Sequence, residues 1–150
     1  MRRRKYALDT NLFIAGMRSA SNADQLAEFH ALFAPFEYLS AIVVQELRAG
    51  LQNAADARRL DAAVVDPFRK RGRLIAPTFA AWQASGGVLA QLVAEDHLDL
   101  RRVSKRKVND ILLALSCREA GVTVVTANLA DFRRINAITS IDFVAPWPSM

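Results

Sequence analysis

The segment Lys5-Tyr6-Ala7-Leu8-Asp9-Thr10-Asn11 places a carboxylate directly after a short apolar run. The apolar residues predict a buried strand over 5–8, so that Asp9 lies at its tip. In an open parallel sheet, ligands bind outside the carboxyl ends of the strands. An acid that ends a buried strand also loses hydration unless it is paired. Asp9 is therefore the first candidate site residue.

Strand-like and helix-like segments alternate along the rest of the chain, which predicts an α/β fold with a short parallel sheet between helices. The run 122–126 is apolar and β-branched without alternation, as in a parallel strand buried on both faces. Further strands are expected at 36–39, 74–76 and 141–144.

The expected helices follow from apolar periodicity and from capping residues. Ser21 or Asn22 is expected to begin the second helix, Ser40 the third, and Gly121 to end the longest late helix. The Asp66-Pro67 step is expected to disturb the helix that contains it. The predicted helical ranges are 11–16, 22–33, 41–51, 55–71, a long region after Pro77, 107–120 and 128–135.

Length and composition indicate one domain over residues 1–150, because 52% of the chain is hydrophobic and such a chain can bury a core of its own. No apolar run approaches the length of a membrane span, which favours a soluble, cytoplasmic protein. The single Cys117 lies in an apolar helical pattern and is expected to be buried. His30 and His97 have no companion at ligand spacing, so both are expected to have packing or surface roles.

Three further acids, Glu46, Asp110 and Asp131, each lie beside an apolar segment that the fold must bury. Carboxylates brought close together either rise in pKa or bind a cation. Oxygen ligands favour a hard ion, Mg²⁺ or Mn²⁺. Such an ion activates water for in-line attack on a phosphodiester. The four acids therefore predict nucleic-acid hydrolysis without a catalytic His or Cys.

A net charge of +5 favours a polyanionic or acidic partner. The basic residues form clusters at 2–5, 69–73 and 101–107. The first is interpreted as a solvated surface, whereas the last runs directly into Asn109-Asp110. Its side chains are candidate RNA phosphate contacts: Arg102, Lys105, Arg106 and Lys107.

Four motifs together resemble a known family, the PIN-domain ribonucleases of the VapC toxin type. They are Leu8-Asp9-Thr10-Asn11, Ser40-x5-Glu46-Leu47-x2-Gly50, Asn109-Asp110-x2-Leu113-Ala114 and Val125-Thr126-x-Asn128-x2-Asp131-Phe132. The resemblance implies a PIN-like three-layer sandwich and a metal-dependent endoribonuclease. It also implies the toxin of a toxin–antitoxin pair, often dimeric and inhibited by a small cognate antitoxin.

Carried over to this sequence, the resemblance assigns Asp9, Glu46 and Asp110 to the metal ion and the attacking water. Asp131 matches a fourth, more variable acid. Hydrogen bonds that orient these acids are expected from four small polar residues, Thr10, Asn11, Thr126 and Asn128. Asn128 departs from the pattern, because some relatives have another acid there, and an amide is a weaker, neutral ligand.

Each acid also has a purely structural explanation. Glu46 could pair with Arg48, Asp110 could be a solvated acid in the first turn of its helix, and Asn128 with Asp131 resembles a helix cap with an acid in the first turn.

Two other classes of protein also have an Asp at the tip of the first strand, as Asp9 is expected to be here. Phosphatases of the haloacid-dehalogenase type need a second Asp where this chain has Asn11. Receiver domains need a Lys after a late strand, where Ala127 and Asn128 stand. A non-catalytic RNA-binding or scaffolding domain of the same fold is the remaining alternative.

Overall fold

The protein folds around a five-stranded parallel sheet in the order β3-β2-β1-β4-β5. The computed structural model describes residues 3–149. From β1 the chain first builds one half of the sheet and then crosses β1 to build the other half, so the direction of winding reverses between β1 and β4. Ligands bind at such a reversal in open α/β sheets. The strands are β1 (Lys5–Leu8), β2 (Glu37–Ser40), β3 (Leu74–Ile75), β4 (Val122–Val125) and β5 (Phe143–Val144).

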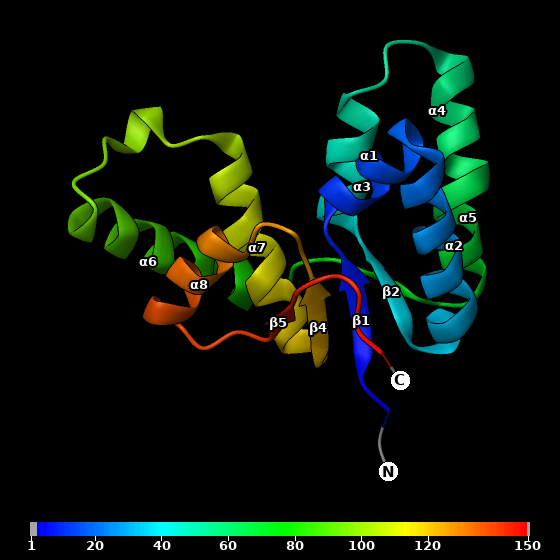
Figure 1. Ribbon diagram of the computed structural model, residues 1–150. Helices are drawn as coiled ribbons and strands as arrows, with labels where there is room; N and C mark the ends of the chain where they lie inside the picture. The colour runs from blue at the N-terminus through cyan, green and yellow to red at the C-terminus, as the bar shows by residue number, and fades with distance from the viewer. Residues whose placement is uncertain (1–2, 150) are drawn as a thin grey trace.

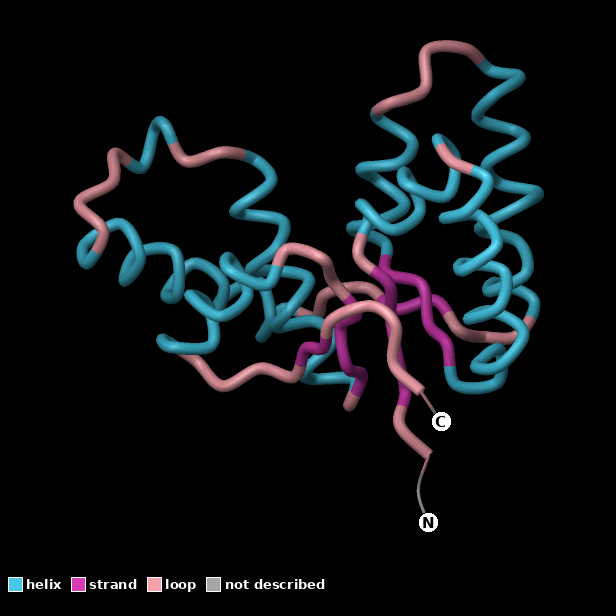
Figure 2. The backbone as a smooth tube through the Cα atoms, in the orientation of Figure 1, coloured by secondary structure: helices cyan, strands magenta, loops and turns pink. Residues whose placement is uncertain are grey.

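Helices cover both faces of the sheet (Figure 1). One face carries α1 (Thr10–Arg18), α2 (Ala20–Phe33), α3 (Ala41–Ala49), α4 (Ala54–Leu60) and α5 (Asp66–Lys70). The other face carries α6 (Phe79–Glu95), α7 (Lys105–Ala120) and α8 (Leu129–Ile138). Figure 2 shows the strands between these two groups of helices. The predicted three-layer α/β sandwich with a short parallel sheet is confirmed.

The strand register places the ends of β1, β4 and β5 side by side at the carboxyl end of the sheet. Leu8 of β1 lies opposite Val125 of β4, and Val125 lies opposite Val144 of β5. The backbone N–H of Asp9 donates to the carbonyl of Val125 over 2.9 Å. The first residue after β1 is thereby held beside the end of β4.

The core lies between the sheet and the two helical layers. β4 and most of α7 are completely buried, and Phe132 of α8 is the largest side chain without exposure. Cys117 is fully buried, as predicted, and burial raises the pKa of its thiol to about 12. None of the helices within residues 3–149 is long and apolar enough to cross a bilayer.

His30 packs against aromatic rings, as expected, but also has a partner that the sequence did not indicate. Its ring lies 6.2 Å from that of Phe13 and 6.3 Å from that of Phe68. Its Nδ1 lies 2.5 Å from Oε1 of Glu37, a carboxylate with no exposed surface at the start of β2. The buried Glu37 is thus paired with a histidine from the neighbouring helix α2.

Several predicted helix starts are wrong by two or three residues. Ser19, not Ser21 or Asn22, begins α2, because its hydroxyl accepts from the N–H of Asn22. Helix α7 begins two residues earlier than the predicted start at 107, with Ser104 as its N-cap. The basic residues 105–107 therefore form its first turn.

The predicted helix over 55–71 is not broken at Asp66-Pro67. The helix instead changes to a π-helical turn over Asp61–Val65 just before Pro67 and continues as α5, so the step disturbs the helix without ending it. The predicted end of α7 is confirmed: Gly121 adopts the left-handed conformation, with φ of 68°, that closes the helix.

Candidate active site

Asp9 joins the end of β1 to the start of α1. Its backbone is extended, and its Oδ1 accepts from the N–H of Thr10 over 2.7 Å as the N-cap of α1. Its Oδ2 accepts from the hydroxyl of Thr126 over 2.8 Å. Burial raises the pKa of Asp9, and these two hydrogen bonds and the charge of Arg106 oppose that rise. The carboxylate is therefore buried, fixed at both oxygens and open to neutralisation by a cation.

Glu46 is connected to Asp9 through Thr10. The hydroxyl of Thr10 donates to Oε1 of Glu46 over 2.8 Å, while the N–H of the same residue binds Asp9. The alternative pairing with Arg48 does not occur, because Arg48 instead lies 3.3 Å from Asp61. Helix α3 therefore turns the half-buried Glu46 toward the end of β1.

Asp110 lies on α7 and is only 3% exposed, which excludes a solvated first-turn acid. Burial raises the pKa of its carboxyl to about 7, with the charge of Asp9 as the next cause and those of Glu46 and Asp131 as smaller ones. The charge of Arg106 acts against this rise. The charges of Asp9, Glu46 and Asp131 thus all act on Asp110, as expected of acids that lie near it.

Asn128 holds the remaining two acids together. Its side-chain nitrogen lies 3.2 Å from Oδ2 of Asp110 and 2.8 Å from Oδ2 of Asp131. Asn128 occupies the N-cap position of α8, but its side chain makes no capping hydrogen bond. Its backbone N–H donates to Thr126 Oγ1, the same hydroxyl that binds Asp9. Asn128 therefore stands at the N-cap position with Asp131 in the first turn, as the structural explanation expected, but its side chain binds Asp110 and Asp131 instead of capping the helix.

Asn11 is placed differently from the other polar residues of the predicted set. Within residues 3–149 its side chain makes no hydrogen bond to any of the acids, and its Oδ1 is buried without a partner. It lines a pocket beside the acids instead. Thr10, Thr126 and Asn128 supply the side-chain contacts that orient the acids.

The four predicted phosphate contacts differ in their distance from the acids. The charge of Arg106 acts on both Asp9 and Asp110, and Lys107 lines a small hollow together with Asp110 and Asp131. Arg102 is exposed and lies 3.9 Å from Asp99. Lys105 is exposed and Lys107 half-buried, both in the first turn of α7.

The donor set fits a hard divalent cation that keeps part of its water shell. No three His, Cys, Asp or Glu side chains among the described residues are gathered closely enough to hold an ion by themselves. Mg²⁺, however, commonly keeps several waters and binds only one or two carboxylates directly. Four coupled carboxylates, one with a pKa near 7, supply the negative charge that such an ion would neutralise.

Comparison with known proteins agrees with this geometry. A family model described as "PIN domain" matches residues 6–138, and the chain belongs to that family. Among curated proteins, a search finds no match.

Solved structures with the same fold cover nearly the whole chain. DNA-bound VapBC from Salmonella typhimurium aligns with a TM-score of 0.69 and 25% identity, over 95% of this chain and 98% of that one. VapBC-1 from nontypeable Haemophilus influenzae gives 0.66 and 21%, over 93% and 96%. FitAcB from Neisseria gonorrhoeae gives 0.66 and 20%, over 96% and 99%. The resemblance to VapC-type PIN domains is thereby confirmed.

Proposed function

We propose that this protein is an endoribonuclease that hydrolyses RNA phosphodiester bonds with the help of Mg²⁺ or Mn²⁺. The observation that carries the proposal is the hydrogen bonding of four acids at the winding reversal of the sheet: Thr10 binds Asp9 and Glu46, and Asn128 binds Asp110 and Asp131. When bound, the ion supplies a water activated for in-line attack and charge stabilisation for the leaving oxygen. Asp9, Glu46 and Asp110 are the residues that would hold it, with Asp131 as the fourth acid.

The chain's own groups provide orientation and electrostatic stabilisation. Thr10 and Thr126 fix both oxygens of Asp9 through the contacts described above, so the carboxylate needs no rearrangement when the substrate arrives. Asn128 holds Asp110 and Asp131 in the same way. Arg106 lies near enough to stabilise the negative charge of the scissile phosphate, and Arg102, Lys105 and Lys107 extend the basic surface along the RNA.

The proposed biological role is that of a toxin held inactive by a cognate antitoxin. Its support is the similarity to DNA-bound VapBC from Salmonella typhimurium and to a toxin–antitoxin complex from Klebsiella pneumoniae. We further propose a homodimer that acts in the cytoplasm, where the single buried Cys117 would remain reduced.

The test is RNA cleavage by Asp9→Asn beside a matched control. Asp142→Asn makes the same acid-to-amide change at an exposed residue just before β5, in a hollow shared with Lys5 and Gly121 at the amino end of the sheet. Asp9→Asn is expected to abolish cleavage and keep the fold, whereas Asp142→Asn cleaves like the parent. Excess EDTA is expected to stop the parent enzyme.

Cleavage that continues in EDTA, or full activity of Asp9→Asn, would refute the mechanism. Binding of RNA without any cleavage in Mg²⁺ or Mn²⁺ would favour the non-catalytic RNA-binding domain instead.

A further inference from the structure

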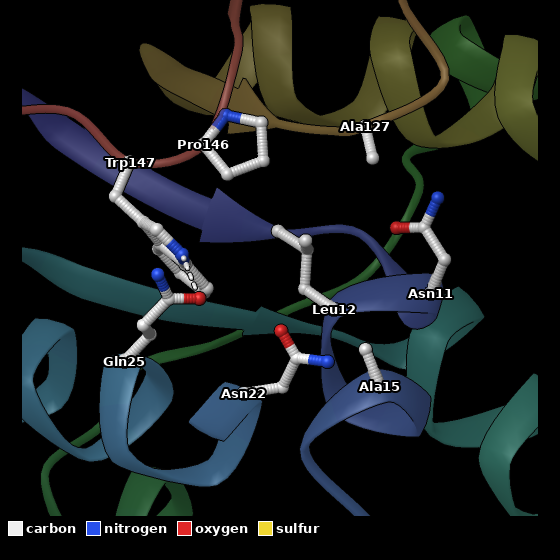
Figure 3. Close-up of a pocket in the computed structure, with 8 residues that line it drawn as sticks. All are labelled: Asn11, Leu12, Ala15, Asn22, Gln25, Ala127, Pro146 and Trp147. Carbon is white, nitrogen blue, oxygen red and sulfur yellow. Dashed lines mark hydrogen bonds between the residues drawn. The ribbon is translucent and has the colours of Figure 1, made fainter. Parts of the chain in front are cut away.

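A pocket of about 370 Å³ opens directly beside the acids and has no role in holding them. Two of its lining residues adjoin residues that bind the acids: Asn11 follows Thr10, and Ala127 lies between Thr126 and Asn128. Its far side is formed by Trp147 of the C-terminal segment and by α2 (Figure 3). Its volume is within the range of about 300–1,000 Å³ found for small-ligand sites.

The lining of this pocket is uncharged. It combines three amide side chains with an indole and small apolar groups: Asn11, Leu12, Ala15, Asn22, Gln25, Ala127, Pro146 and Trp147. A phosphate would find no cation among these residues. A flat ligand with apolar faces and hydrogen-bonding edges suits them, because amides pair with such edges and an indole stacks on such faces.

The amides are available to a ligand. Figure 3 shows the side chains of Asn11 and Asn22 pointing into the hollow. Asn11 Oδ1 is a buried acceptor with no donor among the described residues, which is uncommon enough to need an explanation. The side chain of Asn22 makes no hydrogen bond within residues 3–149. Gln25 uses its Oε1 to accept weakly from Trp147 Nε1 at 3.4 Å.

Trp147 is held in a fixed orientation at the pocket wall. Its ring lies 5.4 Å from that of Phe29, a residue of α2 that is 2% exposed. The indole is thus supported by the core on one side and lines the pocket on another. A preorganised aromatic platform of this kind favours stacking, since little side-chain entropy remains to be lost.

We propose that this pocket binds one unpaired nucleobase of the RNA next to the bond that is cut. Trp147 stacks on the base, and Asn11, Asn22 and Gln25 bind its edge, so these residues determine the base preference of cleavage. The inference rests on the proposed function for the identity of the polymer and for the cut. It also restricts the substrate to single-stranded or looped RNA, because a paired base cannot enter.

The test measures the fluorescence of Trp147 when RNA is added. The chain contains two tryptophans, and Trp82 is 57% exposed on α6, across the sheet from α2. In a Trp82→Phe, Asp9→Asn protein with EDTA, the remaining fluorescence reports on the pocket without cleavage. The probes are short single-stranded RNA oligonucleotides of each base type, and an abasic oligonucleotide with the same sugar–phosphate backbone.

At least one base type is expected to quench Trp147 in a saturable manner, whereas the abasic oligonucleotide does not. Asn22→Ala is expected to raise the Kd for that base about 5- to 150-fold, the range for losing a specific base contact. Gln83→Ala removes an exposed amide on α6 and is the matched control, with Kd unchanged. Equal quenching by the abasic oligonucleotide, no quenching by any RNA, or an unchanged Kd in Asn22→Ala would overturn the proposal.

Cleavage assays on the parent protein and on Asn22→Ala distinguish a failure of the pocket assignment from a failure of the proposed nuclease function. Cleavage whose flanking-base preference is the same in parent and Asn22→Ala proteins overturns the pocket assignment and leaves the nuclease intact. Base-dependent quenching in a protein that never cleaves RNA supports the pocket and overturns the nuclease.

Discussion

The hydroxyl of Thr126 donates to Oδ2 of Asp9 over 2.8 Å, although the two residues are 117 positions apart. This hydrogen bond is the direct side-chain connection between the end of β4 and the end of β1. Thr126→Val removes the donor and keeps the shape, which leaves a buried carboxylate oxygen without its partner. We expect cleavage and Mg²⁺ affinity to fall about 10- to 100-fold, as for other residues that orient metal ligands.

The matched control for this change lies on the same strand. Thr123→Val alters a buried threonine of β4 whose neighbours in a surface hollow include Arg3 and Gly121, at the other end of the strand. Isothermal titration with Mg²⁺ and initial cleavage rates compare the two variants. Equal losses in both would show that Thr126 acts only through stability.

Asn128→Asp is expected to make stability depend on the cation. The new carboxylate would replace an amide that donates to both Asp110 and Asp131, and like charges at this distance repel. The Tm at neutral pH is therefore expected to drop in EDTA and to recover in excess Mg²⁺, with a larger Mg²⁺ response than the parent shows.

Asn136→Asp is the control for added charge, because it keeps the acceptor that binds the N–H of Ile141. Thermal melts of both variants, with and without Mg²⁺, provide the comparison. If the Tm of Asn128→Asp does not change when Mg²⁺ is added, the shared cation site is contradicted.

The metal-free protein is expected to lose stability as the pH rises. Burial raises the pKa of Asp110 to about 7 in the folded state, against 3.8 for an ordinary aspartate side chain, and burial also raises the pKa of Asp9. Between these values the folded protein holds a proton that the unfolded chain releases, so the free energy of unfolding decreases with rising pH. The contribution is fully present below about pH 4 and is lost as the pH passes about 7.

Urea unfolding in EDTA across this range measures the effect, and saturating Mg²⁺ is expected to reduce it. The charges that act on Asp110 are Asp9, Arg106, Glu46 and Asp131, in that order. Asp110→Asn is expected to flatten the pH profile. A flat profile already in the parent would contradict the elevated pKa.

His30→Leu is expected to destabilise the protein by about 3–5 kcal/mol, because it leaves the fully buried Glu37 without its partner. Glu37 Oε2 has no hydrogen bond among the described residues, so Nδ1 of His30 is the main polar partner of this buried carboxyl group. The double variant His30→Leu, Glu37→Leu removes the carboxyl group as well and is expected to recover much of the loss. Urea unfolding of both proteins decides, and a double variant no more stable than His30→Leu would contradict this explanation.

The sequence predicted the sheet and the positions of the acids because both depend on local patterns. Apolar runs identified all five strands, and Asp9 follows the first of them directly. The order of the strands then places Asp110 and Thr126 beside Asp9. The start of α2 could not be read in the same way, because Ser19, Ser21 and Asn22 are all good N-cap residues and the turn after α1 selects among them.

Features that depend on long-range packing could not be predicted from local patterns. Asn128 looked like a cap, and only the placement of α7 shows that its amide faces Asp110. The buried pair of His30 and Glu37 arises where α2 crosses the start of β2. The pocket beside the acids forms because Trp147 returns to pack on Phe29, a contact between opposite ends of the chain.

The pairing of β1 with β4 also determines when the candidate site can assemble during synthesis of the chain. Asp9 is made 117 positions before its partner Thr126, and the acid Asp131 follows Thr126. A nascent chain that ends before β4 has half a sheet and an incomplete set of acids, and closing so long a loop is slow. The candidate site can therefore be completed only after β4 and the first turn of α8 have been made.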